Sequence, residues 1–576
     1  MLTDVGHQLS EWEPIDRLQH LQILFAGQPY WGRELRYFNH APWWYVNEFV
    51  AEETGDRATL EFSNVDYFCR VWLNGQFLGE HEGYSLPFSF DVSDTLRRGE
   101  INRLVVKVWS PWDTAVDRDA RSMRTFRVVR DLVKGTYEHD DTLIARDVNP
   151  VGIYGTVKLC TSSGVSFSGS PALSYTLTED RSSARLIARC TVVASQTTAA
   201  TLDVTVRDSA TGTIVASERR DIAVRAGEEE VTVEVDVAEV GLWNVWDRGT
   251  PQTYDVELRI GESAVSKKIG FRTAEILRDD QRTALVLNGE PLYIRGTSYF
   301  PDVYMSTLTH ERYVRDLTAI KSAGFNLIRV HVHVELDDFY DLCDELGLAV
   351  MQDSEYNWTH PVAPEWAERM VQIYTGTVKA LLHHPSVVTW ILLNEPGVLD
   401  APDALDFETA SATYSRDGGL AMSQSPGPQL AEAITAADPS RPIILGSFCE
   451  EDPLSGDSHN YLGSLAGPNE HYTAIDGTTE KLNTEFGFDA PGSEANLRNT
   501  GKVYERLRPL MPKLPAIQHY QYRLIKYYTE HYRVQRGEPN WGYIQFMFID
   551  LSPQSFYGVY DWWGTPKPAV AALMES

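Results

Sequence analysis

The sequence predicts three domains in succession: an N-terminal β jelly roll, an immunoglobulin-like β-sandwich and a C-terminal (β/α)₈ TIM barrel. Three observations support this multidomain fold. The chain of 576 residues is too long for one hydrophobic core. Apolar and polar residues alternate up to about residue 275, as they do in strands. After Leu285 the apolar period lengthens to about 3.6 residues, as in helices. We place the domains at residues 1–160, 161–275 and 276–576.

The first domain consists of short alternating segments separated by turn residues. Ala58–Phe62 and Leu104–Trp109 alternate apolar and polar side chains, which is typical of half-buried strands. Phe68–Leu73 and Gln76–Gly79 flank Asn74-Gly75, a pair that favours a two-residue hairpin because both positions tolerate positive φ. We therefore expect a β-sandwich or jelly roll.

The second domain continues the alternation, without tryptophan until Trp243. Its clearest strands have the spacing of a small immunoglobulin-like sandwich and comprise Arg185–Val193, Ala200–Arg207, Val231–Val237 and Tyr254–Ile260. No pattern in this domain indicates chemistry, so we expect it to act as a spacer or brace.

The third domain alternates helical patterns with short apolar runs. A helix is predicted before Gly347 because apolar residues fall at i, i+3, i+4 and i+7, namely Phe339, Leu342, Cys343 and Leu346. A second helix is predicted near 310–323, closed by Gly324. Eight strands are predicted near residues 292–296, 326–331, 348–353, 387–394, 443–448, 457–461, 481–486 and 542–549. This span matches the roughly 250 residues of a (β/α)₈ barrel.

Composition excludes several classes of partner. The formal net charge of −30 argues against nucleic acid and anionic membranes, because both are bound by clustered Lys and Arg. The five cysteines are scattered and form no C-x-x-C pair, so neither a disulfide framework nor a zinc cluster is indicated. No apolar run reaches the roughly 18 residues of a membrane span, and no signal peptide is visible, so we expect a cytoplasmic protein. We expect no cofactor and no metal, and leave a homo-oligomer open.

Two apolar, strand-like runs each lead into a glutamate. Ile391–Asn394 precedes Glu395, and Leu482–Thr484 precedes Glu485, 90 residues further on. In a barrel both glutamates would lie at the carboxyl ends of strands, where barrel enzymes place their chemistry. Paired carboxylates there indicate glycoside hydrolysis, which needs a proton for the leaving oxygen and a negative group near the anomeric carbon. The alternative is that each is a solvated residue at a strand end.

Several motifs resemble glycoside hydrolase family 2, in the family's order and over nearly the whole chain. Val71–Gly75 through Phe90–Val92 resembles the family's sugar-binding jelly roll, and Gly270–Arg272 resembles the close of its immunoglobulin-like domain. Leu287–Gly296 resembles its entry into the barrel, and His383–Val387 through Glu395 resembles its acid/base signature.

Within the family, the chain looks most like β-mannosidases and exo-β-glucosaminidases. The segments that carry this narrower resemblance are Phe339–Leu348, Gly542-Tyr543 through Asp561, and Pro566–Pro568. Phe546 and Ile549 depart from it, because those relatives place a Trp and an Asn at these positions ahead of Asp550. No asparagine-x-lysine motif follows Asp561, and that motif resembles carboxylate recognition in β-glucuronidases. A glucuronide is therefore a less favoured substrate.

The resemblance implies a retaining exo-β-glycosidase that removes a terminal neutral β-linked sugar from an oligosaccharide or glycoside. Glu395 would be the protonated general acid/base and Glu485 the ionised nucleophile. The two carboxyl groups would lie ~5–5.5 Å apart and act through a covalent glycosyl-enzyme. A β-mannosidase-like enzyme is the first expectation. The alternatives are a β-galactosidase, an exo-β-glucosaminidase and an inactive carbohydrate-binding homologue.

Three motifs near the glutamates each have two interpretations. Asn394 suits a hydrogen bond to a sugar 2-hydroxyl, although an Asn there can also cap a helix. Arg329 could hold Glu485 by a charge-assisted hydrogen bond or serve a structural ion pair. His331 and His333 form an H-x-H pair whose rings, on a strand, would share one face as in metal-dependent hydrolases. No convincing further ligand set accompanies the pair, so we favour hydrogen-bonding histidines at the barrel rim.

The remaining candidates are expected around the same barrel mouth. His459 and Tyr461 lie in a segment that resembles the family's sixth-strand motif, which makes them candidates for the sugar and nucleophile shell; a structural role is equally expected. The other candidates are Tyr299, Asp353, Trp358, Trp541, Phe546 and Asp550. Aromatic faces complement the apolar side of a sugar ring, but they are also common in barrel packing.

Overall fold

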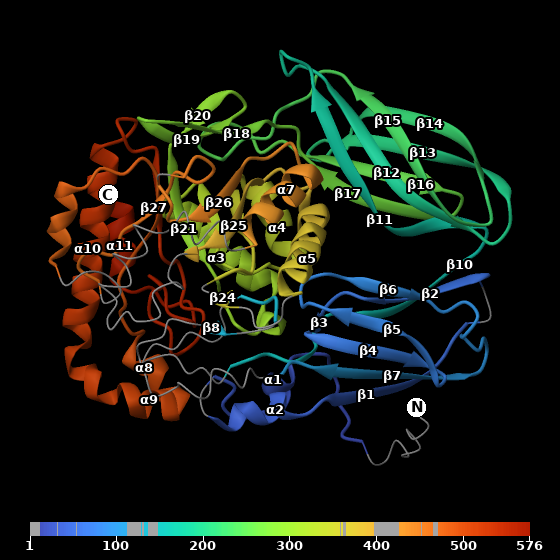
Figure 1. The fold of residues 1–576 in the computed structure, drawn as a ribbon, viewed down its shortest axis with the longest axis horizontal. Coiled ribbons are helices and arrows are strands. Elements are labelled where there is room, and N and C mark those ends of the chain that lie inside the picture. The colour runs from blue at the N-terminus through green and yellow to red at the C-terminus, as the bar shows by residue number, and fades with distance from the viewer. Residues whose placement is uncertain are drawn as a thin grey trace.

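Three domains make up the part of the chain that the structure describes. This computed structural model describes residues 12–30, 33–52, 55–111, 128–129, 132–135, 148–357, 359–360, 365–396, 426–450, 452–464 and 470–576. In Figure 1 the barrel lies on the left, with the jelly roll (blue) below and the sandwich (green to teal) above on the right.

The jelly roll is built from two antiparallel sheets. Its strands are β1 (Trp43–Val50), β2 (Arg57–Phe62), β4 (Phe68–Leu73), β5 (Gln76–Glu82), β6 (Phe88–Asp91), β7 (Ile101–Trp109) and β10 (Val157–Ser162). One sheet has the order β1-β7-β4-β5 and the other β10-β2-β6. Asn74 (φ 51°) and Gly75 (φ 84°) turn the chain from β4 into β5, which confirms the predicted hairpin.

Short elements flank these sheets. They are α1 (Leu21–Phe25), η2 (Arg33–Arg36), α2 (Tyr37–His40), β3 (Val65–Asp66) paired with β9 (Gly152–Ile153), and β8 (Val128–Val129) paired with β24 (Thr359–His360) of the barrel region.

The second domain is a seven-stranded sandwich. Its strands are β11 (Val165–Leu177), β12 (Ala184–Ala194), β13 (Thr198–Asp208), β14 (Ile214–Val224), β15 (Gly227–Val237), β16 (Tyr254–Ile260) and β17 (Ser263–Ile269). The sheets have the orders β11-β12-β15 and β14-β13-β16-β17. The four predicted segments correspond to β12, β13, β15 and β16. β11, β14 and β17 were not predicted, and each is an edge strand. β14 has mostly exposed residues, so it lacks the apolar alternation of a buried strand.

Eight parallel strands form the barrel. They are β21 (Ile294–Tyr299), β22 (Leu327–Val330), β23 (Ala349–Asp353), β25 (Val387–Asn394), β26 (Ile443–Ser447), β27 (Ser458–His459), β28 (Asn483–Phe486) and β29 (Gly542–Gln545). Their order is β26-β25-β23-β22-β21-β29-β28-β27, so β26 and β27 flank the seam of a nearly closed barrel. All eight predicted strands are present, which confirms the predicted fold class. Side chains bridge the seam, since Ser447 Oγ lies 2.9 Å from His459 Nε2.

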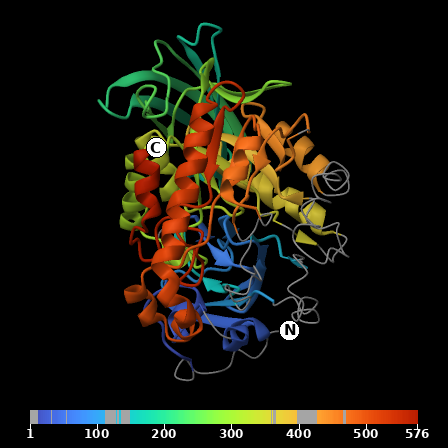
Figure 2. The same cartoon turned by 90° about the vertical axis from the view of Figure 1, so that its left-hand side faces the viewer.

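Helices surround the barrel. The longer ones are α3 (His310–Ser322), α4 (Asp337–Leu346), α5 (Trp366–Leu381), α7 (Gly427–Ala437), α10 (Leu514–Val534) and α11 (Ala569–Glu575). The short ones are η4 (Met305–Thr307), η6 (Tyr472–Gly477), α8 (Glu494–Leu497), η7 (Arg498–Thr500), α9 (Lys502–Leu507) and η8 (Arg508–Lys513). Figure 2 shows α10 and α11, in red, along the side facing the viewer. Gly347 ends α4 in the left-handed conformation (φ 69°), as predicted. Within the part of the chain described, no helix is long and apolar enough to span a membrane.

The barrel interior is apolar at its amino end and polar at its carboxyl end. Leu327, Met351 and Ile544 belong to the apolar cluster at the amino end. A small sheet packs on this cluster and comprises β18 (Ala274–Asp279), β19 (Arg282–Leu287) and β20 (Glu290–Leu292). Alternation along β22 then carries Arg329 to the interior two residues beyond Leu327. The polar groups are therefore gathered at the end where barrel enzymes act.

Both β-domains contact the barrel through defined side chains. Trp243 of the sandwich is buried, and its Nε1 donates to the carbonyl oxygen of Asp344 in α4 at 2.9 Å. The jelly roll reaches the loop after β22, where the backbone N–H of Val334 donates to Tyr84 Oη at 2.9 Å. The jelly roll thus supports a loop that leads out of the carboxyl end of the barrel.

Candidate active site

The two glutamates converge at the carboxyl end of the barrel. Glu395 follows β25 directly and Glu485 lies in β28, beside His459 of β27. One carboxylate oxygen of each glutamate and one ring nitrogen of His459 all lie within 4.8 Å of one another. Residues far apart in the chain therefore share one site.

Two donors hold the Glu485 carboxylate, which is almost fully buried. Arg329 Nη1 donates to Oε1 at 2.8 Å, and Tyr461 Oη donates to Oε2 at 2.8 Å. Burial and the neighbouring Glu485 charge raise the pKa of the Tyr461 phenol well above its usual value, so the phenol remains a donor. The contact predicted between Arg329 and Glu485 is present.

Arg329 connects three acceptors from three other strands. Besides Glu485, it holds Asp353 through Nε and Nη2, and its Nη2 donates to Asn394 Oδ1 at 2.7 Å. Burial alone would raise the pKa of Asp353, but the Arg329 charge outweighs it and the net pKa is lowered. A planar guanidinium suits this task because its five N–H groups form a rigid fork.

Glu395 has a different partner. Its Oε1 lies 2.6 Å from His459 Nδ1, and its own φ is positive at 45°. Ser447 Oγ donates to Asp457 Oδ2 at 2.8 Å and therefore accepts from His459 Nε2 on the other side of the imidazole. Burial lowers the pKa of His459, but the Glu485 and Glu395 charges outweigh burial and raise it overall. The Glu395–His459 contact thus holds a single proton between two acceptor atoms.

Three family models match the chain, one within each predicted domain. Residues 19–146 match "Glycosyl hydrolase 2 galactose-binding domain-like", residues 170–272 match "Glycosyl hydrolases family 2", and residues 279–459 match "Glycosyl hydrolases family 2, TIM barrel domain". The chain belongs to glycoside hydrolase family 2. This confirms the resemblance found in the sequence.

Named relatives in family 2 differ in the sugar they act on. A β-mannosidase B from Aspergillus terreus is 26% identical over 527 residues, which cover 83% of this chain and 60% of that protein. A β-galactosidase from Leuconostoc mesenteroides subsp. mesenteroides is 25% identical over 389 residues, covering 62% of this chain and 33% of that protein. The chain therefore spans between about a third and three fifths of the length of these curated relatives.

Solved structures share the fold over almost the whole chain. The β-D-mannosidase from Dictyoglomus thermophilum superposes with a TM-score of 0.77 at 19% identity, covering 99% of this chain and 74% of that one. A Bacteroides uniformis β-glucuronidase gives a TM-score of 0.73 at 19% identity, covering 99% and 66%. At this identity the likeness shows a common fold.

The histidine pair does not have the predicted geometry. β22 ends at Val330, and Val332 has a positive φ of 52°, so His331 and His333 do not share one strand face. His331 Nδ1 lies 3.7 Å from Glu485 Oε1, whereas His333 Nε2 lies 2.7 Å from Glu335 Oε1. The expectation of one common face is wrong because the chain turns between the two rings.

Three other candidates make contacts outside the glutamate site. Tyr299 points outward, where its hydroxyl donates to Asp316 of α3 at 2.9 Å. Trp541 precedes β29 and lies at the amino end of the barrel, where its carbonyl accepts from the backbone N–H of Ile294. Asp550 forms a buried ion pair with Lys567 at 2.8 Å. The prediction that Tyr299 and Trp541 surround the mouth is wrong, because proximity to a strand does not fix the end or face that a side chain occupies. The predicted place of Asp550 at the mouth stays a prediction.

The aromatic candidates divide differently. Phe546 follows β29 at its carboxyl end, and its ring meets that of His331 edge-on at 4.9 Å between centroids. It therefore adjoins the glutamate site. Trp358 lies outside the described residues, so its predicted role as a binding wall stays a prediction.

Two polar residues at the site were not predicted. Ser447 orients His459, and Asn357 accepts from Asn394 Nδ2 at 2.7 Å. Neither has a sequence signal of its own, since serine and asparagine are common in loops and strand ends. Their roles arise from neighbours that are remote in the chain.

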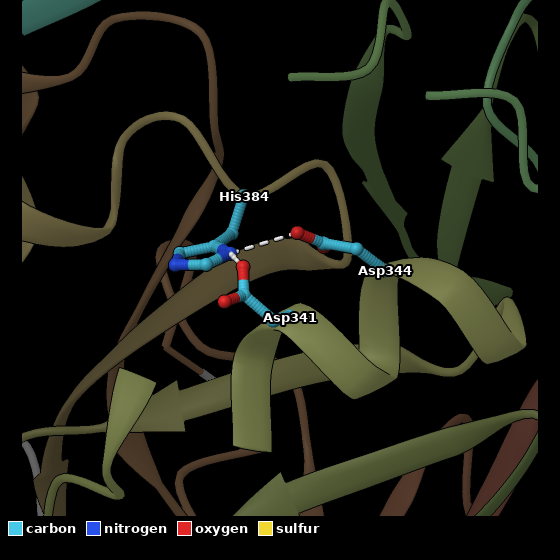
Figure 3. A group of neighbouring side chains, drawn as sticks. All are labelled: Asp341, Asp344 and His384. Carbon is cyan, nitrogen blue, oxygen red and sulfur yellow. Dashed lines mark hydrogen bonds and ion pairs between the residues drawn. The ribbon is translucent and has the colours of Figure 1, made fainter. Parts of the chain in front are cut away.

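A second carboxylate–histidine group lies on the helix side of the barrel (Figure 3). His384 Nδ1 is 2.7 Å from Asp344 Oδ2 and 4.0 Å from Asp341 Oδ1. Both this group and the Glu395–His459–Glu485 group consist of residue types that bind metal ions, with one ligand atom of each residue within 4.8 Å of the others. In the Asp341–Asp344–His384 group, however, Asp344 Oδ1 also accepts from the backbone N–H of Ser386 at 2.9 Å. That bond ties α4 to the turn that leads into β25.

Proposed function

We propose that the chain is a retaining exo-β-glycosidase acting on a terminal neutral sugar, with a β-mannoside as the first choice. The observation that carries this proposal is the close approach of Glu395 and Glu485, which lie in chemically different surroundings. One carboxylate oxygen of Glu395 lies within 4.8 Å of one carboxylate oxygen of Glu485. Retaining enzymes place their carboxyl groups ~5–5.5 Å apart, whereas inverting enzymes leave room for a water between them. The spacing supports retention.

In the first step Glu485 attacks the anomeric carbon as the glycosidic C–O bond breaks. Each carboxylate oxygen of Glu485 accepts one hydrogen bond, Oε1 from Arg329 and Oε2 from Tyr461. Lone pairs therefore remain on both oxygens for the new C–O bond. The leaving oxygen takes the proton held between Glu395 and His459. The product of this step is a covalent glycosyl-enzyme and a free aglycone.

In the second step a water molecule attacks the same carbon from the opposite face. Glu395, now ionised, accepts the proton from that water, and the bond to Glu485 breaks. The proton returns to the Glu395–His459 pair, which restores the starting state. Asn394 is held by Arg329 and Asn357 and is well placed to bond the sugar 2-hydroxyl, an interaction that can strengthen in the transition state.

Variants of the two glutamates test the assigned roles. We expect Glu485→Gln to abolish turnover of every β-glycoside. Glu395→Gln should spare an aryl glycoside whose leaving group needs no proton and should lose a natural disaccharide. Glu311→Gln, on the surface of α3, serves as a matched control. Equal losses of both substrates in Glu395→Gln would contradict the assignment.

The sugar is tested separately from the mechanism. A panel of aryl β-mannoside, β-galactoside, β-glucosaminide, β-glucoside and β-glucuronide would rank the substrates. We expect the mannoside to have the highest kcat/KM. Absence of turnover throughout the panel, with folded protein, would instead support an inactive carbohydrate-binding homologue. Labelling of Glu485 by a mechanism-based fluorosugar would exclude that alternative.

A further inference from the structure

The outer surface of one jelly-roll sheet carries a row of half-buried aromatic rings. Residues alternate along β4, so Phe68 and Trp72 point outward between buried neighbours. Trp44 of β1, Phe77 of β5 and Trp109 of β7 lie in the same sheet of Figure 1. We call these five residues the aromatic face. Adjacent rings are close, with centroid distances of 5.8 Å for Trp44–Trp72, 5.5 Å for Trp72–Phe77 and 5.3 Å for Phe68–Trp109.

Charged side chains are interleaved with these rings. Lys107 Nζ lies 4.9 Å from the Trp109 ring centroid and 5.7 Å from that of Trp44. Arg70 pairs with Glu80 at 2.9 Å on the same surface. Aromatic residues and Arg are enriched in the cores of protein–protein interfaces, but Lys and Glu are depleted there, so Lys107 and Glu80 distinguish this surface from an interface core. It offers flat apolar surfaces bordered by hydrogen-bonding groups.

The aromatic face ends in a pocket between the jelly roll and helix α5. The pocket has a volume of about 640 Å³ and is lined by Phe68, Trp109, Glu80, Glu82, Arg369 and Gln372, among others. Arg369 of α5 forms a bidentate ion pair with Glu82 of β5, which joins the two walls. Gly376 lets the walls approach, because a Cβ there would lie 2.6 Å from Leu86. The lining residues are different from those around Glu395 and Glu485.

This combination fits a carbohydrate. Aromatic rings pack on the apolar faces of pyranose rings, and carboxylate, amide and guanidinium groups bond the hydroxyls. The pocket lies within the range of roughly 300–1,000 Å³ typical of small-ligand sites. The net charge of −30 disfavours nucleic acid and acidic polymers. We propose that the aromatic face and its pocket form a second site that binds a neutral β-linked polysaccharide chain. The choice of ligand class rests on the proposed function.

Retention on insoluble polysaccharide tests this second site without requiring turnover. Each variant is made in the Glu485→Gln background so that the polymer is not digested, and is incubated with insoluble β-mannan, cellulose or xylan. We expect the parent protein to be retained on at least one of these polymers. Trp109→Ala and Trp72→Ala should each weaken retention about tenfold, which corresponds to about 1.4 kcal/mol. Tyr37→Ala should leave it unchanged, because this 69% exposed ring lies on α2.

The outcomes separate the second site from the catalytic one. With Glu485 intact, Trp109→Ala should keep its kcat/KM on an aryl glycoside within about twofold and lose activity on the polymer. Equal retention of parent, Trp72→Ala and Trp109→Ala, or no retention on any polymer, would overturn the second site. Conversion of a dimer into a monomer by Trp109→Ala, seen by light scattering, would assign the face to a subunit interface instead. Failure of the aryl glycoside panel with retention intact would overturn only the proposed catalysis.

Discussion

Replacement of Arg329 by Met removes the only Arg or Lys side chain that, among the described residues, forms an ion pair with Asp353 or Glu485. All three side chains are at most 5% exposed. Breaking a buried ion pair by deleting one partner costs ~3–5 kcal/mol, so we expect a loss of that size in the free energy of unfolding at pH 7. Because Glu485 also loses a donor that helps to position it, kcat/KM should fall roughly 10²–10³-fold.

The loss of stability should depend on pH in a specific direction. Arg329 lowers the pKa of Asp353, so in the parent this carboxyl stabilises the fold above its unfolded pKa, and that contribution is lost only as pH falls through the lower folded value. Without Arg329, burial raises the pKa of Asp353, and protonation on acidification relieves the uncompensated charge. The difference in the free energy of unfolding between parent and variant should therefore become smaller as pH falls from 7 to 5, by at most about 1.4 kcal/mol per pH unit for one carboxyl.

Urea unfolding at pH 7, 6 and 5, followed by tryptophan fluorescence, measures this gap. Arg329→Lys is the companion variant, because it keeps the charge but cannot span three acceptors. It should lose less stability than Arg329→Met while still losing most activity. A gap that is constant with pH, or an Arg329→Met protein with kcat/KM within about threefold of the parent, would refute the reasoning.

Three further predictions follow from the same geometry. His459→Asn should move the alkaline limb of the kcat/KM profile to lower pH, because two acceptors sharing one proton hold it more tightly than Glu395 alone; an unmoved limb would mean that the pair does not act as a unit. Gly135→Ala should lower kcat about tenfold or more, because its Cβ would collide with the Val332 carbonyl and displace the loop that carries His331. Gly477→Ala is the control: a Cβ at that position meets no other atom, so kcat should be unchanged in the same assay. Chelation by EDTA should leave kcat unchanged within about twofold; a loss restored by a divalent metal would reassign Glu395, His459 and Glu485 as metal ligands.

The barrel could be predicted because its signals are local. Each strand is a short apolar run, and Gly347 ends α4 by adopting a conformation that glycine tolerates. The order of runs and helical segments then leaves few alternatives to a parallel barrel. The same order places Glu395 and Glu485 at the carboxyl end, so their convergence was predictable before any distance was known.

Side-chain direction near the strand ends could not be predicted in the same way. The sequence alternation places His331 and His333 on one face, but Val332 packs into the jelly-roll core cluster and adopts a positive φ that turns the chain. Most members of this cluster belong to another domain, more than 100 residues earlier. Local periodicity carries no information about it.

Composition and local pattern were sufficient to establish three domains, eight barrel strands and a pair of glutamates at one barrel end, because each depends on neighbours within a few residues. The proton partner of Glu395 and the fork of Arg329 depend on contacts across the barrel. These contacts form only when segments distant in the chain are packed together, and only the tertiary structure could decide them.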